Sequence, residues 1–453
     1  MTPTQPSART LALDLLTALR ERRGFLTDLI DDVLPRVILS GADRRLMTAL
    51  VFGVVRRAAT LDALIRPHVT RPWDKVEPVW RDVLRLGAYQ LVMLNQVPQH
   101  AAVHETVELA EHVGRPEAKG FLNGILRRIA ETTTDEFFDE PDVDTVPTDD
   151  GRYRKLTEEV MPDPVEAPAD YLALGFGLPA WFADRLLARH EDTEAFRLAF
   201  HFNAVPSIWL RANTLQLTRE AFQQVLELGG IRSEPGDAPQ ALLLLDGVPI
   251  RDIPGYHAGE FCVQDHASQL VAAALQVEPG MTVLDLCAAP GGKTTHLAEL
   301  MKNRGRIIAC DIDADRLATV TALADRMKIT IIETHLLSEA NPAPLGPFDA
   351  VLVDAPCSNT GVLGRRPEVR HRFHPREFEH LMRLQTELLE TAVSRVKPGG
   401  AIVYSTCSID EGENVGVVND VLNQRPRLRL EAEAEAVPGR PSDGGYWARL
   451  RLG

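Results

Sequence analysis

Hydrophobic residues stand three or four positions apart through the first part of the chain, as Leu11, Leu15 and Leu19 do. This spacing places them on one face of a helix. Glycine and proline, for example at Pro72 and Pro98, separate the periodic segments. The pattern therefore predicts an all-helical bundle over residues 1–130, with enough apolar residues for a core of its own.

The periodicity stops in residues 131–168, where large apolar residues are few and prolines and acidic residues are frequent. Such a composition buries too little apolar surface to offset the entropy of ordering the chain. Repulsion between like charges also favours an extended conformation. We therefore expect this stretch to be a disordered acidic linker that takes no part in chemistry.

Regular patterns return after this stretch. Residues 179–187 and 219–228 have helical spacing, whereas residues 207–213 alternate between apolar and polar positions as a strand does. These elements predict a small α+β module over residues 169–260.

Short apolar runs alternate with helical segments from residue 261 to residue 453. Unbroken apolar runs are typical of strands that are buried on both faces. Alternation of such strands with helices predicts a doubly wound, mostly parallel sheet, so we expect a multidomain protein that ends in an α/β domain. The expected strands are 282–286, 307–310, 330–332, 350–353 and 401–404. Two helices are expected to begin at Lys293 and Ala314, and a third is expected to cover 376–396.

The composition is that of a globular protein, with 45% hydrophobic and 25% charged residues among 453. No apolar run approaches the roughly 20 residues that cross a bilayer, and the N-terminus has no signal-peptide core. We therefore expect a cytoplasmic protein without a membrane partner. The five cysteines form no Cys-x-x-Cys pair, which argues against a metal site or a disulfide framework. A monomer is expected.

The net charge of −15 argues at first against a nucleic-acid partner. Its distribution changes that conclusion, because residues 131–170 contain 14 acidic and three basic residues. Residues 1–130, by contrast, contain 18 basic and 14 acidic residues, so RNA binding stays open. Paired arginines recur in this part of the chain and favour a phosphate-contacting surface over ordinary solvated helix faces: Arg22-Arg23, Arg44-Arg45, Arg56-Arg57 and Arg127-Arg128.

The first strand–helix turn of the α/β domain has the features of a nucleotide-binding loop. A strand leads into a small loop that contains glycine and opens a helix, and this loop is neither a Walker A motif nor Gly-x-Gly-x-x-Gly. Asp311 follows the next strand, where a carboxylate is placed to bind a ribose diol. A nucleoside without a pyrophosphate, such as S-adenosylmethionine, suits this arrangement. The expected cofactor-binding residues of the loop are Cys287, Ala288, Ala289, Pro290, Gly291, Gly292 and Lys293.

Two later strands deliver an acid and two thiols to the same edge of the sheet. Asp354 and Cys357 follow the strand 350–353, and Cys407 follows the strand 401–404. A thiolate is a strong nucleophile that can also be expelled again. Methylation of cytosine at C5 needs such a group, because addition of a thiolate at C6 makes the weakly nucleophilic C5 enamine-like. An acid near N3 would stabilise the adduct.

Three motifs carry a resemblance to a known family: Leu286–Lys293, Asp354–Cys357 and Thr406-Cys407-Ser408. They resemble the RNA (cytosine-5) methyltransferases of the NOL/NOP/Sun class. The order of domains is similar to that of the RsmB (Sun/Fmu) ribosomal RNA methyltransferases, in which a NusB-like helical domain precedes a small RNA-binding segment and a Rossmann-like catalytic domain. Residues 97–105, 119–123 and 263–268 resemble further parts of that family.

The resemblance implies a role for each matching residue. Cys407 would be the nucleophile that attacks C6, and Cys357 would assist breakdown of the adduct and release of the RNA. The loop from Cys287 to Lys293 would hold S-adenosylmethionine, Asp311 would hold its ribose, and Asp354 would line the junction of cofactor and base. Ribosomal RNA, most simply of the small subunit, is the implied substrate.

One departure from the family concerns the end of the third strand. The family usually has Gly-Asp there, with the carboxylate near the adenine, whereas this chain has Glu333-Thr-His335-Leu-Leu. We assign neither Glu333 nor His335 to the site. Beyond the catalytic loop, a group of arginines is expected to contact RNA phosphates: Arg365, Arg366, Arg370 and Arg372.

Three alternatives remain open from the sequence. The first is cytosine-5 methylation of transfer RNA or of another RNA. The second is a DNA cytosine-5 methyltransferase, whose nucleophile sits in the Pro-Cys loop and which needs no Thr-Cys-Ser on the next strand. The third is an RNA-binding assembly or antitermination factor in which catalysis has lapsed, a reading that the missing Gly-Asp favours.

Overall fold

The structure is a computed structural model, and it describes residues 6–21, 24–372, 375–439 and 442–453. The chain divides into two compact units. The first is formed by Met1–Val205 together with Leu363–Arg372, and the second by Pro206–Val362 together with Phe373–Gly453. No helix among the described residues is long and apolar enough to cross a membrane.

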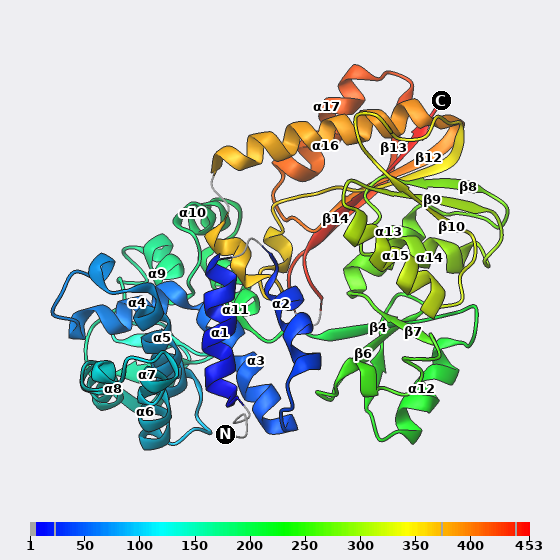
Figure 1. Ribbon diagram of the computed structural model, residues 1–453. Coiled ribbons are helices and arrows are strands. Elements are labelled where there is room, and N and C mark those ends of the chain that lie inside the picture. The colour runs from blue at the N-terminus through cyan, green and yellow to red at the C-terminus, as the bar shows by residue number, and fades with distance from the viewer. Residues whose placement is uncertain (1–5, 22–23, 373–374, 440–441) are drawn as a thin grey trace. The chain divides into compact units, whose positions relative to one another are not determined.

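The first unit is mainly a helical bundle, as the periodicity predicts (Figure 1). One side of each helix supplies its core, for example Leu50 and Val54 in the third helix and Leu84 in the fifth, all of which are buried. Its helices are α1 (Ala8–Glu21), α2 (Leu26–Val33), α3 (Gly41–Arg56), α4 (Ala58–Ile65), α5 (Pro78–Met93), α6 (Gln99–Val107), α7 (Leu109–His112), α8 (Lys119–Thr132), α9 (Pro168–Gly175), α10 (Ala180–Arg189) and α11 (Asp192–Asn203). The last three helices pack with this unit, although they lie within residues 169–260, where a small α+β module was expected.

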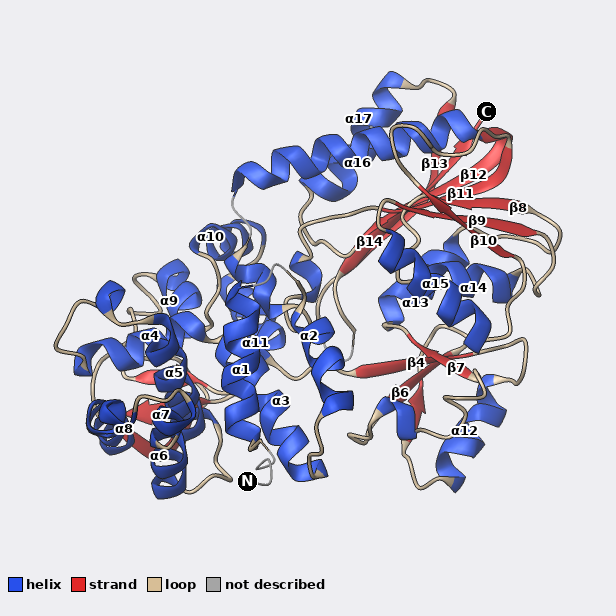
Figure 2. Cartoon of the chain, viewed as in Figure 1, coloured by secondary structure: helices blue, strands red, loops and turns tan. Residues whose placement is uncertain are grey.

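The acidic segment that was expected to be a disordered linker is folded, so that prediction is wrong. It forms an antiparallel sheet in the order β1-β3-β2, from β1 (Thr133–Phe138), β2 (Thr145–Pro147) and β3 (Tyr153–Leu156) (Figure 2). The guanidinium of Arg57 donates to Asp149 at 2.7 Å and to the Pro147 carbonyl at 2.7 Å. Because Arg57 comes from the helical bundle, the composition of the segment itself gives no sign of these contacts.

The paired arginines of this unit do not form one surface. Arg56 and Arg57 are 5% and 0% exposed and bind groups inside the unit, so a phosphate-contacting role for this pair is wrong. The pairs Arg44-Arg45 and Arg127-Arg128 are exposed, and their contact with RNA stays a prediction. The pair Arg22-Arg23 lies outside the described residues.

A segment from the second half of the chain completes the first unit. Residues 363–372, which contain the short helix η7 (Pro367–His371), pack with the helical bundle. The Arg370 guanidinium donates to the carbonyls of Arg56, Phe176 and Phe202 and to Asn203 Oδ1, at distances of 2.6 to 3.0 Å. Arg370 is therefore a buried structural residue, and the expectation that it contacts RNA phosphates is wrong.

Arg370→Leu should lower the free energy of unfolding of the first unit by about 3–5 kcal/mol, because four buried acceptors lose their donor. Urea unfolding followed by tryptophan fluorescence measures this change. The matched control is Arg44→Leu at an exposed position of α3, which should change stability by less than about 0.5 kcal/mol. Equal stabilities of the two variants would contradict the structural role of Arg370.

The second unit contains two sheets. A small antiparallel sheet has the order β5-β6-β4-β7, and the large sheet has the order β10-β9-β8-β11-β12-β14-β13. In the large sheet the first five strands are parallel, and β14 and β13 continue it antiparallel. The strands are β4 (Ile208–Ala212), β5 (Ser233–Pro235), β6 (Ala241–Leu244), β7 (Phe261–Val263), β8 (Thr282–Asp285), β9 (Arg306–Asp311), β10 (Ile332–Leu336), β11 (Phe348–Asp354), β12 (Val396–Thr406), β13 (Leu428–Ala436) and β14 (Gly445–Leu452).

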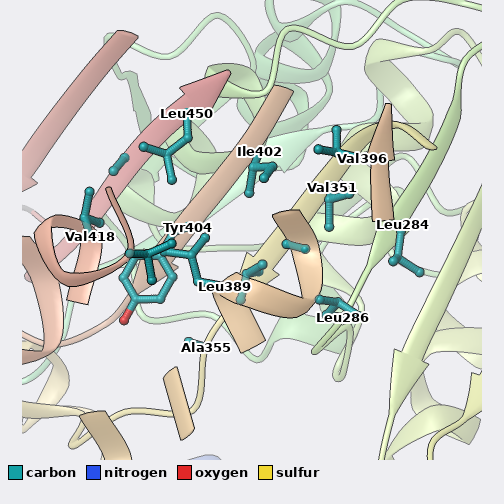
Figure 3. Packing of buried hydrophobic residues seen from close by; sticks show 14 of the residues in the cluster. Leu284, Leu286, Val351, Ala355, Leu389, Val396, Ile402, Tyr404, Val418 and Leu450 are labelled. Carbon is teal, nitrogen blue, oxygen red and sulfur yellow. The ribbon is translucent and has the colours of Figure 1, made fainter. Parts of the chain in front are cut away.

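Helices cover both faces of the large sheet, which explains its unbroken apolar strands. Val351 and Val353 pack with Leu389 on one face, as Figure 3 shows for Val351 and Leu389, and Ala350 and Leu352 pack toward the opposite face. The predicted doubly wound sheet is confirmed. The helices of this unit are α12 (Arg219–Leu228), α13 (His266–Ala274), α14 (Gly292–Leu300), α15 (Ala314–Arg326), α16 (Pro375–Arg395) and α17 (Val417–Gln424), with short turns η5 (Ile250–Asp252), η6 (Thr360–Val362) and η8 (Gly412–Gly416).

Candidate active site

The two predicted thiols lie together at the carboxyl ends of neighbouring strands. Asp354, the last residue of β11, pairs in register with Ser405 of β12, so the segments that follow the two strands leave the sheet side by side. The Sγ atoms of Cys357 and Cys407 are 3.3 Å apart. The register of two parallel strands therefore brings together two cysteines that are 50 residues apart in the chain.

The surroundings of the two thiols differ. Cys357 is 6% exposed, and its hydrogen bond with Cys407 and its burial hold its pKa well above the ordinary value. Cys407 is only partly buried, and its thiol donates to Asn359 Oδ1 at 3.2 Å. Asn359 in turn donates to the Cys357 carbonyl at 2.8 Å. Cys357 is thus the protonated inner thiol, and Cys407 is the more accessible one.

Asp354 forms an ion pair with the lysine of the predicted cofactor loop. The Lys293 ammonium lies 2.7 Å from Asp354 Oδ2, and Ser405 Oγ donates to Asp354 Oδ1 at 2.9 Å. Burial by itself would lower the pKa of Lys293, but its attraction to and hydrogen bond with Asp354, together with the nearby Cys407 and Asp285, outweigh burial and the pKa is raised. Lys293 was predicted only as a cofactor ligand, and its ion pair with Asp354 is visible only in the structure.

The loop from Cys287 to Lys293 joins β8 to α14 in the manner that the sequence predicts. Gly291 has a φ of +103°, which favours glycine, and a Cβ there would lie 3.1 Å from the Cα of Val320. The loop can therefore approach α15 closely only with glycine at this position. Burial raises the pKa of the Cys287 thiol well above its ordinary value, so this cysteine lacks thiolate character.

Asp285, at the end of β8, is a further candidate site residue that was not predicted from the sequence. It is 1% exposed, Thr294 Oγ1 donates to its Oδ2 at 2.8 Å, and its Oδ1 has no hydrogen-bond partner. Burial raises the pKa of this carboxyl to about 7. An acceptor without a partner beside the loop fits a ligand that carries an ammonium group, such as S-adenosylmethionine. Its position at the end of the first strand was the available signal.

Asp311 closes the other side of the loop. It is 4% exposed, its Oδ2 accepts from the Ala289 amide at 3.3 Å, and it lies 3.5 Å from Arg316. The structure therefore places it against the cofactor loop, as the position after the second strand predicts. Its binding of a ribose stays a prediction.

The two residues considered at the missing Gly-Asp have other partners. Glu333 forms an ion pair with Arg306 at 2.6 Å, at the start of β9 and away from the carboxyl edge. His335 Nε2 lies 3.0 Å from the Pro342 carbonyl oxygen. We therefore assign neither side chain to the cofactor site. No group of side chains suited to a metal ion occurs in the described part of the chain.

The raised pKa of Asp285 predicts a pH-dependent stability. Between about pH 4 and pH 7 the folded chain keeps a proton on Asp285 that the unfolded chain has released. Unfolding therefore becomes easier as the pH rises through this range, and Asp285→Asn removes this dependence. From pH 4.5 to pH 8 the stability of the variant relative to the unmodified protein should increase by about 2–4 kcal/mol.

Urea unfolding of the ligand-free protein at several pH values measures this difference. Asp420→Asn, at an exposed position of α17, is the matched control and should give a profile parallel to that of the unmodified protein. A parallel profile for Asp285→Asn would show that Asp285 is already ionised at low pH.

Family models match three parts of the chain. Residues 272–440 match the 16S rRNA methyltransferase RsmB/F model, residues 6–131 match the NusB family, and residues 178–251 match the ferredoxin-like domain of RsmF/B-like methyltransferases. The matches follow the predicted order of a NusB-like, a small α+β and a methyltransferase part.

Curated relatives are similar over nearly the whole chain. A probable ribosomal RNA small subunit methyltransferase B from Bacillus subtilis is 32% identical over 95% of this chain and 91% of its own length. A protein of the same description from Synechocystis is 35% identical over 94% of this chain and 91% of its length. The ribosomal RNA small subunit methyltransferase B of Salmonella arizonae is 32% identical over 98% and 99%.

Solved structures share the fold. The crystal structure of PH0851 has a TM-score of 0.78 and 25% identity and covers 99% of this chain and 100% of that one. A methyltransferase homologue from Pyrococcus horikoshii has a TM-score of 0.55 and 27% identity and covers 62% of this chain and 97% of that one. These similarities agree with the geometry at the strand ends and show that the chain belongs to the RsmB family of ribosomal RNA small subunit methyltransferases.

Proposed function

We propose that this protein methylates C5 of a cytidine in small-subunit ribosomal RNA through a covalent bond between Cys407 and C6 of the base. S-adenosylmethionine, held by the loop from Cys287 to Lys293, supplies the methyl group. The observation that carries the proposal is the pair of thiols 3.3 Å apart beside the Lys293–Asp354 ion pair.

Each residue of the pair has a part in the proposed reaction. The Cys407 thiolate forms a bond to C6, and the electron pair of the C5–C6 double bond moves into the ring. N3 takes a proton from solvent, and its N–H then donates to the Asp354 carboxylate. C5 then takes the methyl group, whose bond to the sulfonium sulfur of S-adenosylmethionine would break and leave S-adenosylhomocysteine, and N3 gives up its proton. A base takes the proton from C5, the double bond re-forms, and the bond from sulfur to C6 breaks with the help of Cys357.

The environments of the thiols support Cys407 as the nucleophile. Burial and a raised pKa disfavour the thiolate of Cys357. Cys407 is less buried and interacts electrostatically with Lys293, whose ammonium stabilises negative charge on its sulfur. A DNA cytosine-5 methyltransferase would instead use the Pro-Cys loop, so the surroundings of the two thiols favour RNA.

Ribosomal RNA is proposed because the relatives named above act, by their names, on the small ribosomal subunit. A target base must leave its helical stack to reach a thiol at a sheet edge, which costs a few kcal/mol. Single-stranded loops of the RNA meet this requirement most easily.

The test incubates the purified protein and labelled S-adenosylmethionine with four substrates: naked small-subunit RNA, small subunits, transfer RNA and DNA. We expect label in ribosomal RNA, recovered as 5-methylcytidine after nuclease digestion. Label only in DNA, or at another atom of the base, would overturn the proposal. RNA binding without any transfer would favour a binding factor.

A further inference from the structure

A single buried carboxylate lies behind both thiol loops. Glu413, in the turn η8 that follows β12, is 0% exposed. Its Oε1 accepts from the Ser358 amide at 2.9 Å and from Gln385 Nε2 at 3.0 Å. Its Oε2 accepts from Ser358 Oγ at 2.5 Å and from Ser408 Oγ at 2.6 Å. None of these donors carries a charge, so the carboxylate does not serve as half of an ion pair with them.

The serines that bind Glu413 are the residues directly after the two cysteines. Ser358 follows Cys357, and Ser408 follows Cys407. Their hydroxyl oxygens are 3.1 Å apart, and Gln385 also donates to the carbonyl of Pro356, the residue directly before Cys357, at 2.9 Å. The same carboxylate therefore restrains the backbone next to each sulfur atom.

Further bonds join the two loops beside this carboxylate. Thr360 Oγ1 lies 2.9 Å from Ser408 Oγ and accepts from the Ile409 amide at 3.1 Å. The Gly361 amide donates to the Cys407 carbonyl at 3.0 Å. Glu413 thus receives four hydrogen bonds on its two oxygens. A carboxylate can accept all four because both of its oxygens are acceptors only.

We propose that Glu413 is a positioning residue that sets the separation of the Cys357 and Cys407 thiols for the reaction. The proposal rests on the function proposed above and deepens it, because release of the base requires the two sulfurs to act on one adduct. Glu413 touches neither sulfur and acts through Ser358 and Ser408. Misplacement of a reacting group by about 1 Å can cost on the order of 10²-fold in rate.

Two variants separate positioning from simple loss of stability. Glu413→Ala removes all four acceptor contacts, and Glu413→Gln keeps one oxygen that accepts from the Ser358 amide and Gln385. We expect kcat to fall on the order of 10²-fold in the alanine variant and by a smaller factor in the glutamine variant. Affinity for S-adenosylmethionine, measured by calorimetry, should change less than about twofold. Rates are compared per folded molecule, with melting curves recorded for each variant.

A second measurement reports the sulfur separation without any turnover. Diamide takes one hydrogen from each of two neighbouring thiols, which leaves a disulfide and a hydrazine, and mass spectrometry of peptides detects the bond. We expect the Cys357–Cys407 bond to form at least about tenfold more slowly in Glu413→Ala than in the unmodified protein. Glu433→Gln, which alters an exposed carboxylate on β13 that binds Tyr446, is the control and should change neither readout.

Unchanged kcat and an unchanged bond-forming rate in folded Glu413→Gln and Glu413→Ala would overturn the proposal. If the alanine variant does not fold, the glutamine variant decides by the same two readouts. Failure of the proposed function has a different signature, because Cys407→Ala would then retain methyl transfer. The rate of disulfide formation would still report the separation of the two sulfurs in the Glu413 variants.

Discussion

Cys407→Ala should reduce methyl transfer to ribosomal RNA by at least about 10³-fold. Without the thiol no covalent bond forms at C6, and C5 stays too weak a nucleophile to take the methyl group. Initial rates with labelled S-adenosylmethionine measure the loss. In the proposed reaction Cys407 bonds to the RNA base and not to S-adenosylmethionine, so calorimetry should show an unchanged affinity for S-adenosylmethionine.

Cys262→Ala is the matched control for this experiment. Cys262 is a buried thiol of β7 in the same unit, and it packs in the apolar core. Its replacement should leave kcat within a few-fold of the unmodified protein, at a modest cost in stability. Full activity of Cys407→Ala would disprove the assignment of the nucleophile and would direct attention to Cys357.

Cys357→Ala should trap the covalent RNA–protein adduct. In the structure its sulfur is 3.3 Å from that of Cys407, and its raised pKa keeps it protonated. A neighbouring thiol that can donate a proton to the departing sulfur favours its expulsion from C6. Without it, a slow-migrating species that nuclease removes should accumulate on denaturing gels, and turnover should fall by at least about 10²-fold.

The double variant Cys357→Ala/Cys407→Ala is the control for the trapped species. It should form no adduct, because the bond to the RNA is made by Cys407. An adduct that persists in the double variant would place the covalent bond on another residue. Absence of any adduct in Cys357→Ala, together with normal turnover, would show that release does not depend on this thiol.

The sheet of the second unit follows from local pattern. Central parallel strands contain unbroken apolar runs because helices cover both faces, and such runs are visible in residues 307–310 and 350–353. The same pattern predicted which residues stand at strand ends. Convergence of Asp354, Cys357 and Cys407 could therefore be expected before any coordinates, since the carboxyl ends of parallel strands share one edge.

Other features depend on partners that lie far away in the sequence. The acidic segment was expected to be disordered because its own composition is poor in apolar residues, yet Arg57 and Tyr89 of the helical bundle bind its Asp149. Arg370 was expected on a surface, whereas its acceptors come from α11 and from the ends of α3 and α9. The composition of a segment gives the number of its charged side chains, but it does not show which of them bind a partner from elsewhere in the folded chain.

The sequence by itself determined the helical and α/β patterns, the family resemblance, and the positions of the two thiols, the acid and the glycine-containing loop at strand ends. These are local properties, because period, strand ends and short motifs need no distant partner. Only the tertiary structure decided that Lys293 binds Asp354, that Cys357 is the inner thiol, and that Glu413 lies behind both loops. Hydrogen bonds and burial of this kind arise between residues that meet only when the chain has folded.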